Sequence, residues 1–466
     1  MAELTTERPR GMAPRPTGPT AESVRIDGLD VARGLALLGI FFVNIFLMAN
    51  PLGMMGEVGP VRPGAASDAI HHATRVLFES KSYPLFSMLF GMGLVLMFDR
   101  AKAAGRPFAI RYLRRLVMLF LMGIAHGLLL WWGDILAYYA MIGFVVMWLA
   151  PLRARTMLIL SGVCVLIPTV IAVGFPVLSS VVEPASLPPD TVPLVAEAPA
   201  GVPAKGSLAE LAGENAEVPA IASSFGEFMS QLQTGKIVDG PFDPLWSGFE
   251  TQSVAQGPYA DAVAVRALNW VSGAIFWLGL NGIAFHIAGM FLLGGALMRS
   301  GFFDPANRRF AVRLALVGAL VGVPLAILAE LLAGQPETSE LAHAVSYFLT
   351  LLFGPLVSLL YLSLATLAAQ SWRTNVLVRA VASAGRMALT NYIMQTLIVA
   401  ALVQNWGLGW YGTLDRVQMA GLVVGIYTFQ LIASPIWLSV FTMGPLEWAW
   451  RWWTYLRVPA LIRPKA

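Results

Sequence analysis

Residues 33–50, RGLALLGIFFVNIFLMAN, form an almost uncharged apolar run that is long enough to cross a lipid bilayer as a helix. Similar runs recur along the 466-residue chain, which is 57% hydrophobic and 12% charged and has a mean hydropathy of +0.68. A spanning segment has to satisfy every backbone amide internally, and the alternating pattern of a membrane β-barrel is absent. The sequence therefore predicts an all-α integral membrane protein.

About ten apolar windows of roughly 20 residues predict transmembrane helices, with one long external loop after the fifth. The windows cover residues 33–50, 84–98, 112–131, 134–151, 156–178, 270–298, 312–334, 342–369, 386–404 and 417–441. The second is short, and the sixth and eighth are long enough to tilt or to contain a break. The predicted parts are a tail (1–24), an N-terminal bundle (25–178), the loop (179–268), a C-terminal bundle (269–441) and a final segment (442–466).

The distribution of charge predicts the orientation, although the net charge is only +4. Basic residues gather in alternate joints, at 99–115, 153–155, 299–309, 373–379 and 451–465. All of these joints fall on one side, which the positive-inside rule assigns to the cytoplasm together with both chain ends. Residues 1–24 are rich in Pro, Thr and Arg and lack the apolar core of a signal peptide, so we expect a disordered cytoplasmic tail.

Two segments outside the spans have their own patterns. The first half of the external loop is rich in Pro and Ala and predicts a flexible segment, whereas FGEFMSQLQ, residues 225–233, is expected to form a helix on the outer surface. GPLEWAWRWWTYLR, residues 444–457, has a proline at a helix start and a row of Trp and Tyr residues. It predicts an interfacial helix on the inner leaflet.

Ionisable and amide side chains near the first two spans are candidates for a site, because membrane spans exclude such groups. At 100° per residue Asp30, Arg33 and Asn44 share one stripe of the first helix, with Asn44 about 16 Å along the axis from Arg33. They form either the polar wall of a cavity or a packing seam with a charged anchor at the membrane boundary. Glu79 and Lys81 precede the second span on the outer side, where Lys81 either binds an anion or extends to the membrane surface.

His126 and Asp134 stand out in the apolar stretch GIAHGLLLWWGDIL, residues 123–136. The histidine lies towards the outer end of the third span, and a turn at 131–133 would fold the carboxylate back towards it. The carboxylate would then fix the imidazole tautomer and raise its basicity, as general-base catalysis requires. The alternative is a histidine bonded within the bundle and an aspartate that caps the next helix.

A second polar group lies in SAGRMALTNYIMQ, residues 383–395. Asn391 and Gln395 are one turn apart on one face, and Arg386 marks the inner end of that span. The sequence has no Walker loop, strand-bound GxGxxG, HExxH or GxSxG motif, and its single cysteine excludes a Cys-based metal site. The basic residues are spread over short joints, so nucleic-acid binding is not expected.

Five ordered stretches, LDVARGLALLGIFFVN, LFSMLFGMG, HGLLLWWGDIL, GRMALTNYIMQTL and GPLEWAWRW, resemble the YeiB family of bacterial inner-membrane proteins. The resemblance covers about residues 25–455, apart from the external loop. The family, whose C-terminal part is a domain of unknown function, is grouped with transmembrane acyltransferases such as heparan-glucosaminide N-acetyltransferase and surface-glycan O-acetylases. The catalytic histidine of the lysosomal enzyme lies between its first two spans. Here that region holds His71 and His72 without the surrounding motif, so we favour His126.

The resemblance implies an enzyme of the bacterial cytoplasmic membrane. It would transfer an acyl group such as acetyl from cytoplasmic acyl-CoA to a hydroxyl or amine of an outward-facing lipid, glycan or small molecule. His126, helped by Asp134, would deprotonate the acceptor. The oxyanion and the substrate would be held by Asn44, Glu79, Lys81, Asn391 and Gln395, and coenzyme A by Asp30, Arg33, Arg114, Arg115 and Arg386. Membrane lipids are expected partners, and a homodimer is a possible assembly.

Two other classes of function compete with the enzyme. A transporter or exporter would use polar residues near the membrane midplane to coordinate substrate and protons, although no internal repeat is detectable in the sequence. A non-catalytic membrane sensor would use the external loop as its functional element. An acyltransferase requires an acyl donor and a transporter does not, so this requirement distinguishes the two.

Overall fold

The computed structural model describes residues 27–54, 64–181, 221–237, 240–275, 282–333 and 340–463. These residues form helices and no named β-strand, which confirms the all-α membrane protein. The predicted tail and most of the predicted flexible segment lie outside the described residues. The helices are α1 (Asp27–Ala49), α2 (Ala65–Leu77), α3 (Ser82–Ala103), α4 (Ala109–Leu129), α5 (Leu136–Val146), α6 (Ala154–Val181), α7 (Phe225–Gln233), α8 (Pro244–Ala255), α9 (Tyr259–Gly273), α10 (Ile283–Arg299), α11 (Arg308–Val317), α12 (Val323–Ala333), α13 (Glu340–Ser371), α14 (Val376–Arg386), α15 (Ala388–Val403), α16 (Arg416–Val440) and α17 (Pro445–Tyr455).

Seven helical segments of the described chain are long and apolar enough to cross a membrane, and α14 with α15, bent by 84°, would make an eighth. Two further predicted spans correspond to the shorter apolar helices Leu136–Leu149 and Ile283–Arg299. Within the predicted sixth span, 270–298, α9 ends at Gly273 and α10 begins at Ile283. Gly282, between them, has a left-handed φ of 64° that favours glycine.

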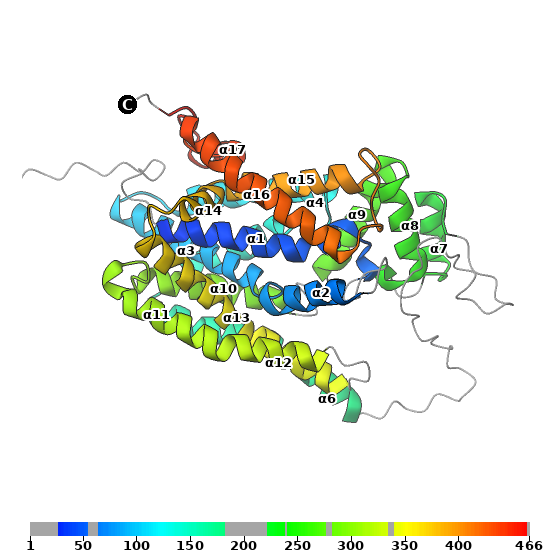
Figure 1. Ribbon diagram of the computed structural model, residues 1–466, viewed down its shortest axis with the longest axis horizontal. Coiled ribbons are helices and arrows are strands. Elements are labelled where there is room, and N and C mark those ends of the chain that lie inside the picture. The colour runs from blue at the N-terminus through cyan, green and yellow to red at the C-terminus, as the bar shows by residue number, and fades with distance from the viewer. Residues whose placement is uncertain are drawn as a thin grey trace, which may run out of the picture.

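Helix α1 lies in the middle of the bundle and contacts α3, α13, α14, α15 and α16 (Figure 1). Glycines allow two of the closest helix contacts. A Cβ on Gly91 of α3 would lie 1.9 Å from the carbonyl oxygen of Phe291 in α10, and one on Gly294 of α10 would lie 2.0 Å from that of Met88 in α3. Such reciprocal approach of small residues is the usual way in which membrane helices pack.

The segment predicted as an external loop contains a small helical layer at one end of the bundle (Figure 1). Helix α7 has the predicted bounds, and α8 and α9 follow it. Phe228, Trp246, Phe249 and Val265 form a buried core of their own. We call α7, α8 and α9 the outer cap, because the charge pattern predicts that they lie on the outer side.

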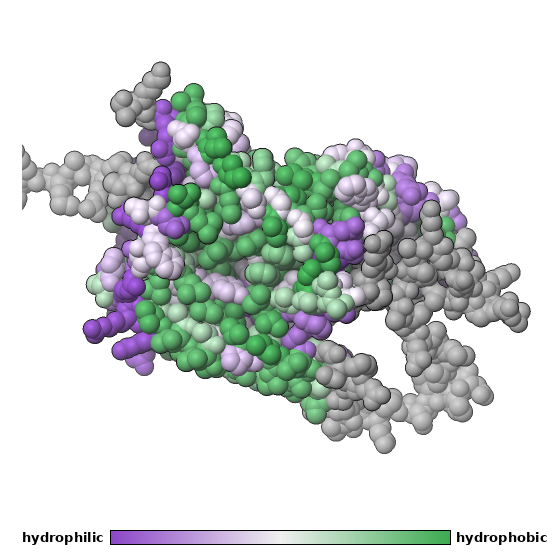
Figure 2. Space-filling view, viewed as in Figure 1, coloured by the Kyte–Doolittle hydropathy of each residue, from purple (hydrophilic) through white to green (hydrophobic). Residues whose placement is uncertain are grey.

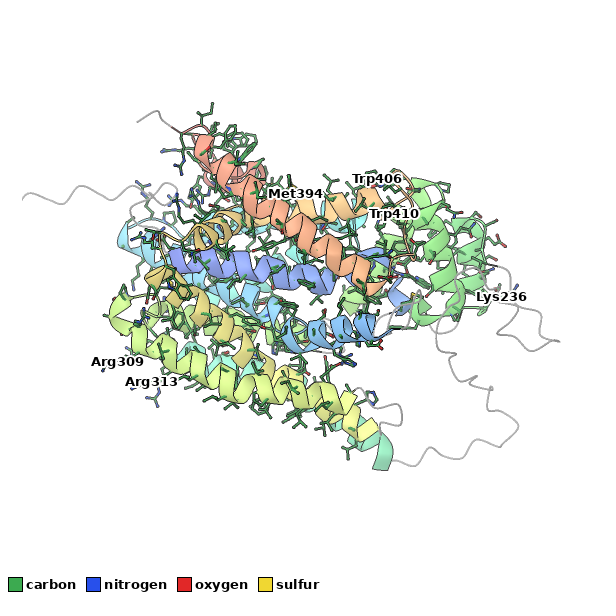
Figure 3. The ribbon with its side chains drawn as sticks, viewed as in Figure 1. Lys236, Arg309, Arg313, Met394, Trp406 and Trp410 are labelled. Atoms are coloured by element: carbon green, nitrogen blue, oxygen red, sulfur yellow. The ribbon has the colours of Figure 1, made fainter. Side chains whose placement is uncertain are left out.

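The two ends of the bundle differ in charge. Figure 2 shows apolar surface over the middle of the molecule and hydrophilic residues mainly towards its ends. The starts of α1 and α11 and helix α17 lie at one end, where Arg309 and Arg313 point outwards, and Lys236 lies at the opposite end in the outer cap (Figures 1 and 3). We call the arginine-bearing end the inner end, as the sequence predicts.

Candidate functional site

His126 and Asp134 form a buried pair at the outer end of α4 and α5. Nδ1 of His126 lies 2.8 Å from Oδ1 of Asp134, and the two side chains are 1% and 0% exposed. The predicted fold-back of the carboxylate is therefore present. When Nδ1 carries the proton and donates it in a hydrogen bond to the carboxylate, Nε2 is left as the basic nitrogen.

The local sequence explains why the pair can form. His126 lies in the last turn of α4, and the backbone amides of Leu130 and Trp131 both donate to its carbonyl. Asp134 then caps α5, because its Oδ2 accepts the amide of Ala137 at 2.8 Å. A Cβ on Gly123 would lie 2.3 Å from that amide nitrogen and 2.6 Å from Oδ2. Only glycine at 123 lets the start of α5 approach α4 this closely.

Aromatic rings enclose the imidazole. The Tyr392 ring of α15 lies 5.2 Å from it and the Trp131 ring 6.3 Å, centroid to centroid. Nε2 of His126 is buried and has no hydrogen-bond partner among the described residues. Buried polar nitrogens normally have a partner, so this atom is a candidate for contact with a substrate.

The outer cap holds the α4–α5 turn in place. Arg266 of α9 donates from Nε to the carbonyl of Leu128 at 2.9 Å and from Nη1 to Oε1 of Gln404 at 3.0 Å. Gln404 in turn donates to the carbonyl of Leu130 at 2.6 Å. Sequence reasoning missed both residues. A lone arginine inside the apolar stretch AVAVRALNWV, residues 262–271, is the sequence signal that could have found Arg266.

Glu250 joins the cap to the bundle. Its carboxylate is buried and accepts the Tyr411 hydroxyl at 2.8 Å and the backbone amide of Leu52 at 3.2 Å. Burial raises the pKa of Glu250 to about 7, against the opposing effect of these hydrogen bonds. The contact between α8, the end of α1 and the loop before α16 therefore contains a group that titrates near neutral pH.

Asn391 and Gln395 lie in a polar seam between α15 and α16. Asn391 donates from Nδ2 to the carbonyl of Ala384 at 3.0 Å and to Oγ of Ser434 at 3.1 Å. Gln395 donates to Gln430 at 2.9 Å, and Gln430 donates to the carbonyl of Asn391 at 2.8 Å. Both amides are thus bonded to a neighbouring helix, although Tyr392 between them contacts His126.

The stripe predicted on α1 is divided between two environments. Arg33 donates from Nη1 to Oδ1 of Asp30 at 2.9 Å, as its spacing predicted. Asn44 is half-buried further along the helix. Arg33 and Arg451 lie near enough to Arg115 for their charges to act on it, so the inner ends of α1, α4 and α17 share a basic cluster.

The predicted interfacial helix α17 is held against the bundle. The Trp450 ring covers the Arg115 guanidinium at 3.8 Å, and its Nε1 donates to the Arg115 carbonyl at 2.9 Å. Glu447 accepts the amides of Leu389 and Thr390 at 2.7 and 3.1 Å and so caps the start of α15. Burial raises the pKa of Glu447.

The remaining predicted inner residues have different surroundings. Arg386 donates to the Thr442 carbonyl at 3.5 Å, and Arg114 is half-buried on α4. A cavity of about 650 Å³ opens at the inner end, but it is lined by residues that were not predicted. Among these are Arg308, which donates to Ser371 at 2.8 Å, and Arg373, which pairs with Asp27 at 2.9 Å.

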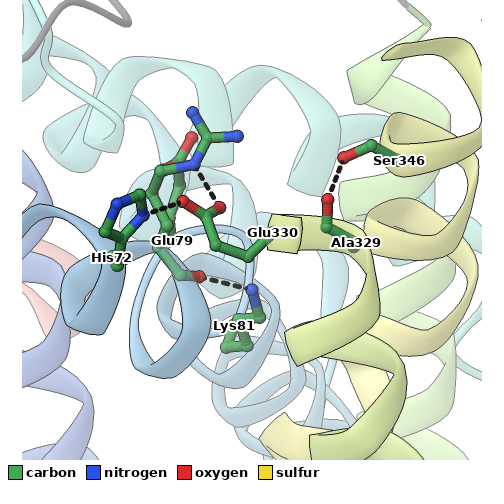
Figure 4. A network of polar contacts seen from close by, with 7 residues as sticks. His72, Glu79, Lys81, Ala329, Glu330 and Ser346 are labelled. Atoms are coloured by element: carbon green, nitrogen blue, oxygen red, sulfur yellow. Dashed lines mark hydrogen bonds and ion pairs between the residues drawn. The ribbon is translucent and has the colours of Figure 1, made fainter. Parts of the chain in front are cut away.

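The C-terminal half of α2, the turn before α3, the end of α12 and the start of α13 surround another polar group (Figure 4). His72 lies 2.8 Å from Oε1 of Glu330 through Nδ1, and Arg75 donates to Oε2 of Glu330 at 2.6 Å. Lys81 is buried and donates to the Arg75 carbonyl at 2.6 Å, while Glu79 is half-exposed. Lys81 and Glu79 line a cavity of about 290 Å³ here.

Two other histidine sites were compared with His126. Ligand atoms of His71, His72 and Glu330 lie within 4.8 Å of one another, as a metal ion would require. Both Glu330 oxygens are already engaged, however, and the guanidinium of Arg75 disfavours a further cation. His286 bonds through Nδ1 to the Tyr83 hydroxyl at 3.1 Å and through Nε2 to the Leu351 carbonyl at 3.0 Å, so both of its ring nitrogens are already engaged.

Comparisons with known proteins agree with the resemblance in the sequence. Residues 297–457 match the family described as "Protein of unknown function (DUF418)". The chain is 28% identical to the uncharacterized protein YxaH of Bacillus subtilis, over 94% of this chain and 96% of YxaH. It is 29% identical to the uncharacterized protein YeiB of Escherichia coli, over 91% of this chain and 94% of YeiB. No solved structure matches the chain. These matches support the resemblance to the YeiB family, and the region that matches DUF418 lies in the C-terminal part of this chain.

Proposed function

We propose that this protein is an acyltransferase of the bacterial cytoplasmic membrane. It would move an acyl group, such as acetyl, from cytoplasmic acyl-CoA to a hydroxyl or amine of an outward-facing lipid, glycan or small molecule. The observation that carries the proposal is the buried His126–Asp134 pair with Nε2 free of any described partner. The resemblance to transmembrane acyltransferases supplies the reaction class.

In the proposed reaction Nε2 of His126 takes the proton of the acceptor as its oxygen or nitrogen attacks the thioester carbonyl carbon. Asp134 stabilises the imidazolium that results. The carbon–sulfur bond then breaks, and the imidazolium returns the proton to the leaving thiolate. The acyl group ends on the acceptor, and free coenzyme A is released.

Access to the pair requires movement, because both side chains are sealed. The outer cap is the element that would move, since Arg266 and Gln404 hold the turn next to His126. On the other side, the inner cavity and the basic cluster offer arginines for the phosphates of coenzyme A. His126 lies about 25 Å along α4 from the inner end of that helix, so the acyl arm would have to cross most of the membrane.

The second histidine–carboxylate pair, His72–Glu330, is a weaker candidate for the base. Arg75 donates to the same carboxylate at 2.6 Å, and its positive charge opposes a second positive charge on the imidazole. Asp134, in contrast, accepts only from His126 and from a backbone amide in the described contacts. This difference favours His126.

The test is transfer of labelled acetyl from acetyl-CoA to lipid or glycan acceptors by protein reconstituted in vesicles. His126→Gln should abolish transfer, and the matched variant His72→Gln should retain it. Full activity in His126→Gln would remove this histidine from the mechanism. Thermal unfolding of each variant shows whether the fold is intact.

A transporter is the second candidate, because the 84° break between α14 and α15 resembles the broken helices of secondary transporters. In such proteins the exposed start of the second half-helix binds an anionic substrate. Here Glu447 already occupies the start of α15. Flux of a substrate into vesicles that contain no acyl donor would favour the transporter over the enzyme.

A further inference from the structure

The outer cavity of about 290 Å³ lies between the α2–α3 turn and helices α12 and α13, and it is separate from His126. Charged and hydroxyl-bearing residues line one part of it. Ala326, Ala329 and Ala333 of α12 line another part. Its volume is near the lower limit of ordinary ligand pockets, so it fits a small polar group.

Lys81 is fixed in this cavity by its backbone. Its amide donates to the carbonyl of Phe78 at 3.1 Å, and its carbonyl accepts the hydroxyl of Ser358 from α13 at 2.7 Å. The preceding residue, Ser80, has a left-handed φ of 56°, and its carbonyl oxygen is 2.9 Å from where a Cβ on Gly354 would lie. Close packing at Gly354 thus holds a strained turn that directs Lys81 inwards.

The ammonium group of Lys81 lacks an ion-pair partner in the part of the chain that the structure describes. The residue is only 3% exposed, and its recorded side-chain contact is one hydrogen bond to the Arg75 carbonyl. No described carboxylate oxygen lies within 4.0 Å of Nζ, because Glu330 is turned towards His72 and Arg75. Lysines are rarely buried unless paired, and an ammonium has three donors, of which one is used here.

The lining also includes two carboxylates, those of Glu79 and Glu330, and several hydrogen-bond donors. Arg75 supplies guanidinium N–H groups besides the one bonded to Glu330, and Ser80 and Thr350 supply hydroxyls. Tyr347 also lines the cavity, and its buried hydroxyl has no partner among the described residues. A ligand rich in hydrogen-bond acceptors and negative charge would satisfy these donors.

We infer that the Lys81 cavity binds a phosphate group, and that the ligand is a phosphate ester carried by an outer-leaflet lipid or a free phosphate. The lipid source fits the position. The cavity lies at the end of the bundle predicted to be outermost, and Ile327, Leu328 and Leu331 on α12 are exposed beside its alanine wall, where an acyl chain would lie. The inference goes beyond the proposed acyl transfer and holds whether or not His126 is reactive.

The experiment measures thermal unfolding of the full chain, purified in detergent. The probes are potassium phosphate against potassium chloride at equal ionic strength, and short-chain phosphatidylglycerol against the matching diacylglycerol, which lacks phosphate. Wild-type protein should be stabilised by a phosphate-bearing probe and not by its control. Lys81→Met should lose the shift without lowering the unfolding temperature in chloride, because it removes an unpaired buried charge. Lys236→Met, in the outer cap, should behave as wild type.

Glu79→Gln tests the sign of the ligand charge at a half-exposed position where the fold is not at risk. Removing this carboxylate from the cavity lining should tighten phosphate binding, whereas a cationic ligand would bind more weakly. A shift with phosphatidylglycerol alone assigns the site to lipid, and a shift with phosphate alone assigns it to the free ion. The inference is overturned if neither probe stabilises the protein, if Lys81→Met keeps the shift, or if Glu79→Gln weakens it.

Discussion

Two buried ionisable centres lie at the outer end of the bundle, and they differ in how their charges are compensated. His126 and Asp134 compensate each other, and aromatic rings and the outer cap seal them from both water and lipid. Lys81 has no ion-pair partner within 4.0 Å among the described residues, and it opens onto a cavity that Glu79 and Glu330 also line. In the proposals made above, the first arrangement would prepare a base before any substrate arrives, whereas the second would be completed only by a ligand. Burial alone therefore does not distinguish a reactive site from a binding site. What distinguishes them is whether the buried charged group is already paired within the protein.

The largest effect is expected for Asp134→Asn. The amide can still accept the Ala137 N–H, so the cap of α5 is kept, but its NH₂ group can face Nδ1 and impose the wrong tautomer on His126. We expect the rate of acyl transfer to fall about 10³–10⁴-fold, as in other histidine–aspartate systems. Steady-state kinetics measure the loss. A rate within about twofold of wild type, with an intact fold, would show that the His126–Asp134 pair has only a structural role.

The second prediction concerns the outer cap, which covers the His126–Asp134 pair. The pKa of Glu250 is about 7 in the folded protein, above its ordinary value of 4.5. Between these two pH values Glu250 is therefore mostly protonated in the folded state and mostly ionised in the unfolded state. The stability from this shift is fully present below pH 4.5 and is lost as pH rises through about 7. It amounts to about 3 kcal/mol. The outer cap should therefore be looser at pH 8 than at pH 5.

Hydrogen exchange of α8, α9 and residues 128–135 at the two pH values measures this loosening. Glu250→Gln should remove the pH dependence, because the amide does not titrate. Protection that stays equal at both pH values in wild type, or a pH dependence that persists in Glu250→Gln, would contradict the role of Glu250. The cap would then not be the pH-sensitive cover of His126.

The smallest effect is expected in the polar seam between α15 and α16, next to the His126–Asp134 pair. Gln395→Leu leaves Oε1 of Gln430 without its donor and should cost about 1–3 kcal/mol of unfolding free energy. Replacing both glutamines by leucine should recover part of that loss. Because Gln395 is bonded to α16, acyl transfer should change by less than about twofold in both variants. A tenfold loss of activity without loss of stability would return Gln395 to the oxyanion role predicted from sequence.

Helix patterns and local spacing in the sequence predicted several details correctly. The bounds of α7, the proline start of α17 and the Asp30–Arg33 pair all depend on residues within one or two turns. The sequence did not predict where α9 ends and α10 begins within the window 270–298, because an apolar window does not mark helix ends. The sequence also did not show that Trp450, 335 residues further along the chain, covers Arg115 in the basic cluster at the inner end.

By itself the sequence determined the all-α membrane fold, the basic inner end and the short set of polar residues that remain among the spans. These follow from composition and helical period, which are local properties. Only the tertiary structure decided which polar groups are satisfied. Glu330 reaches His72 across 258 residues, Gln395 bonds to α16, and Lys81 is left without an ion-pair partner among the described residues. Such pairings depend on close helix packing at glycines such as Gly123 and Gly354, where a single Cβ would keep the partners apart.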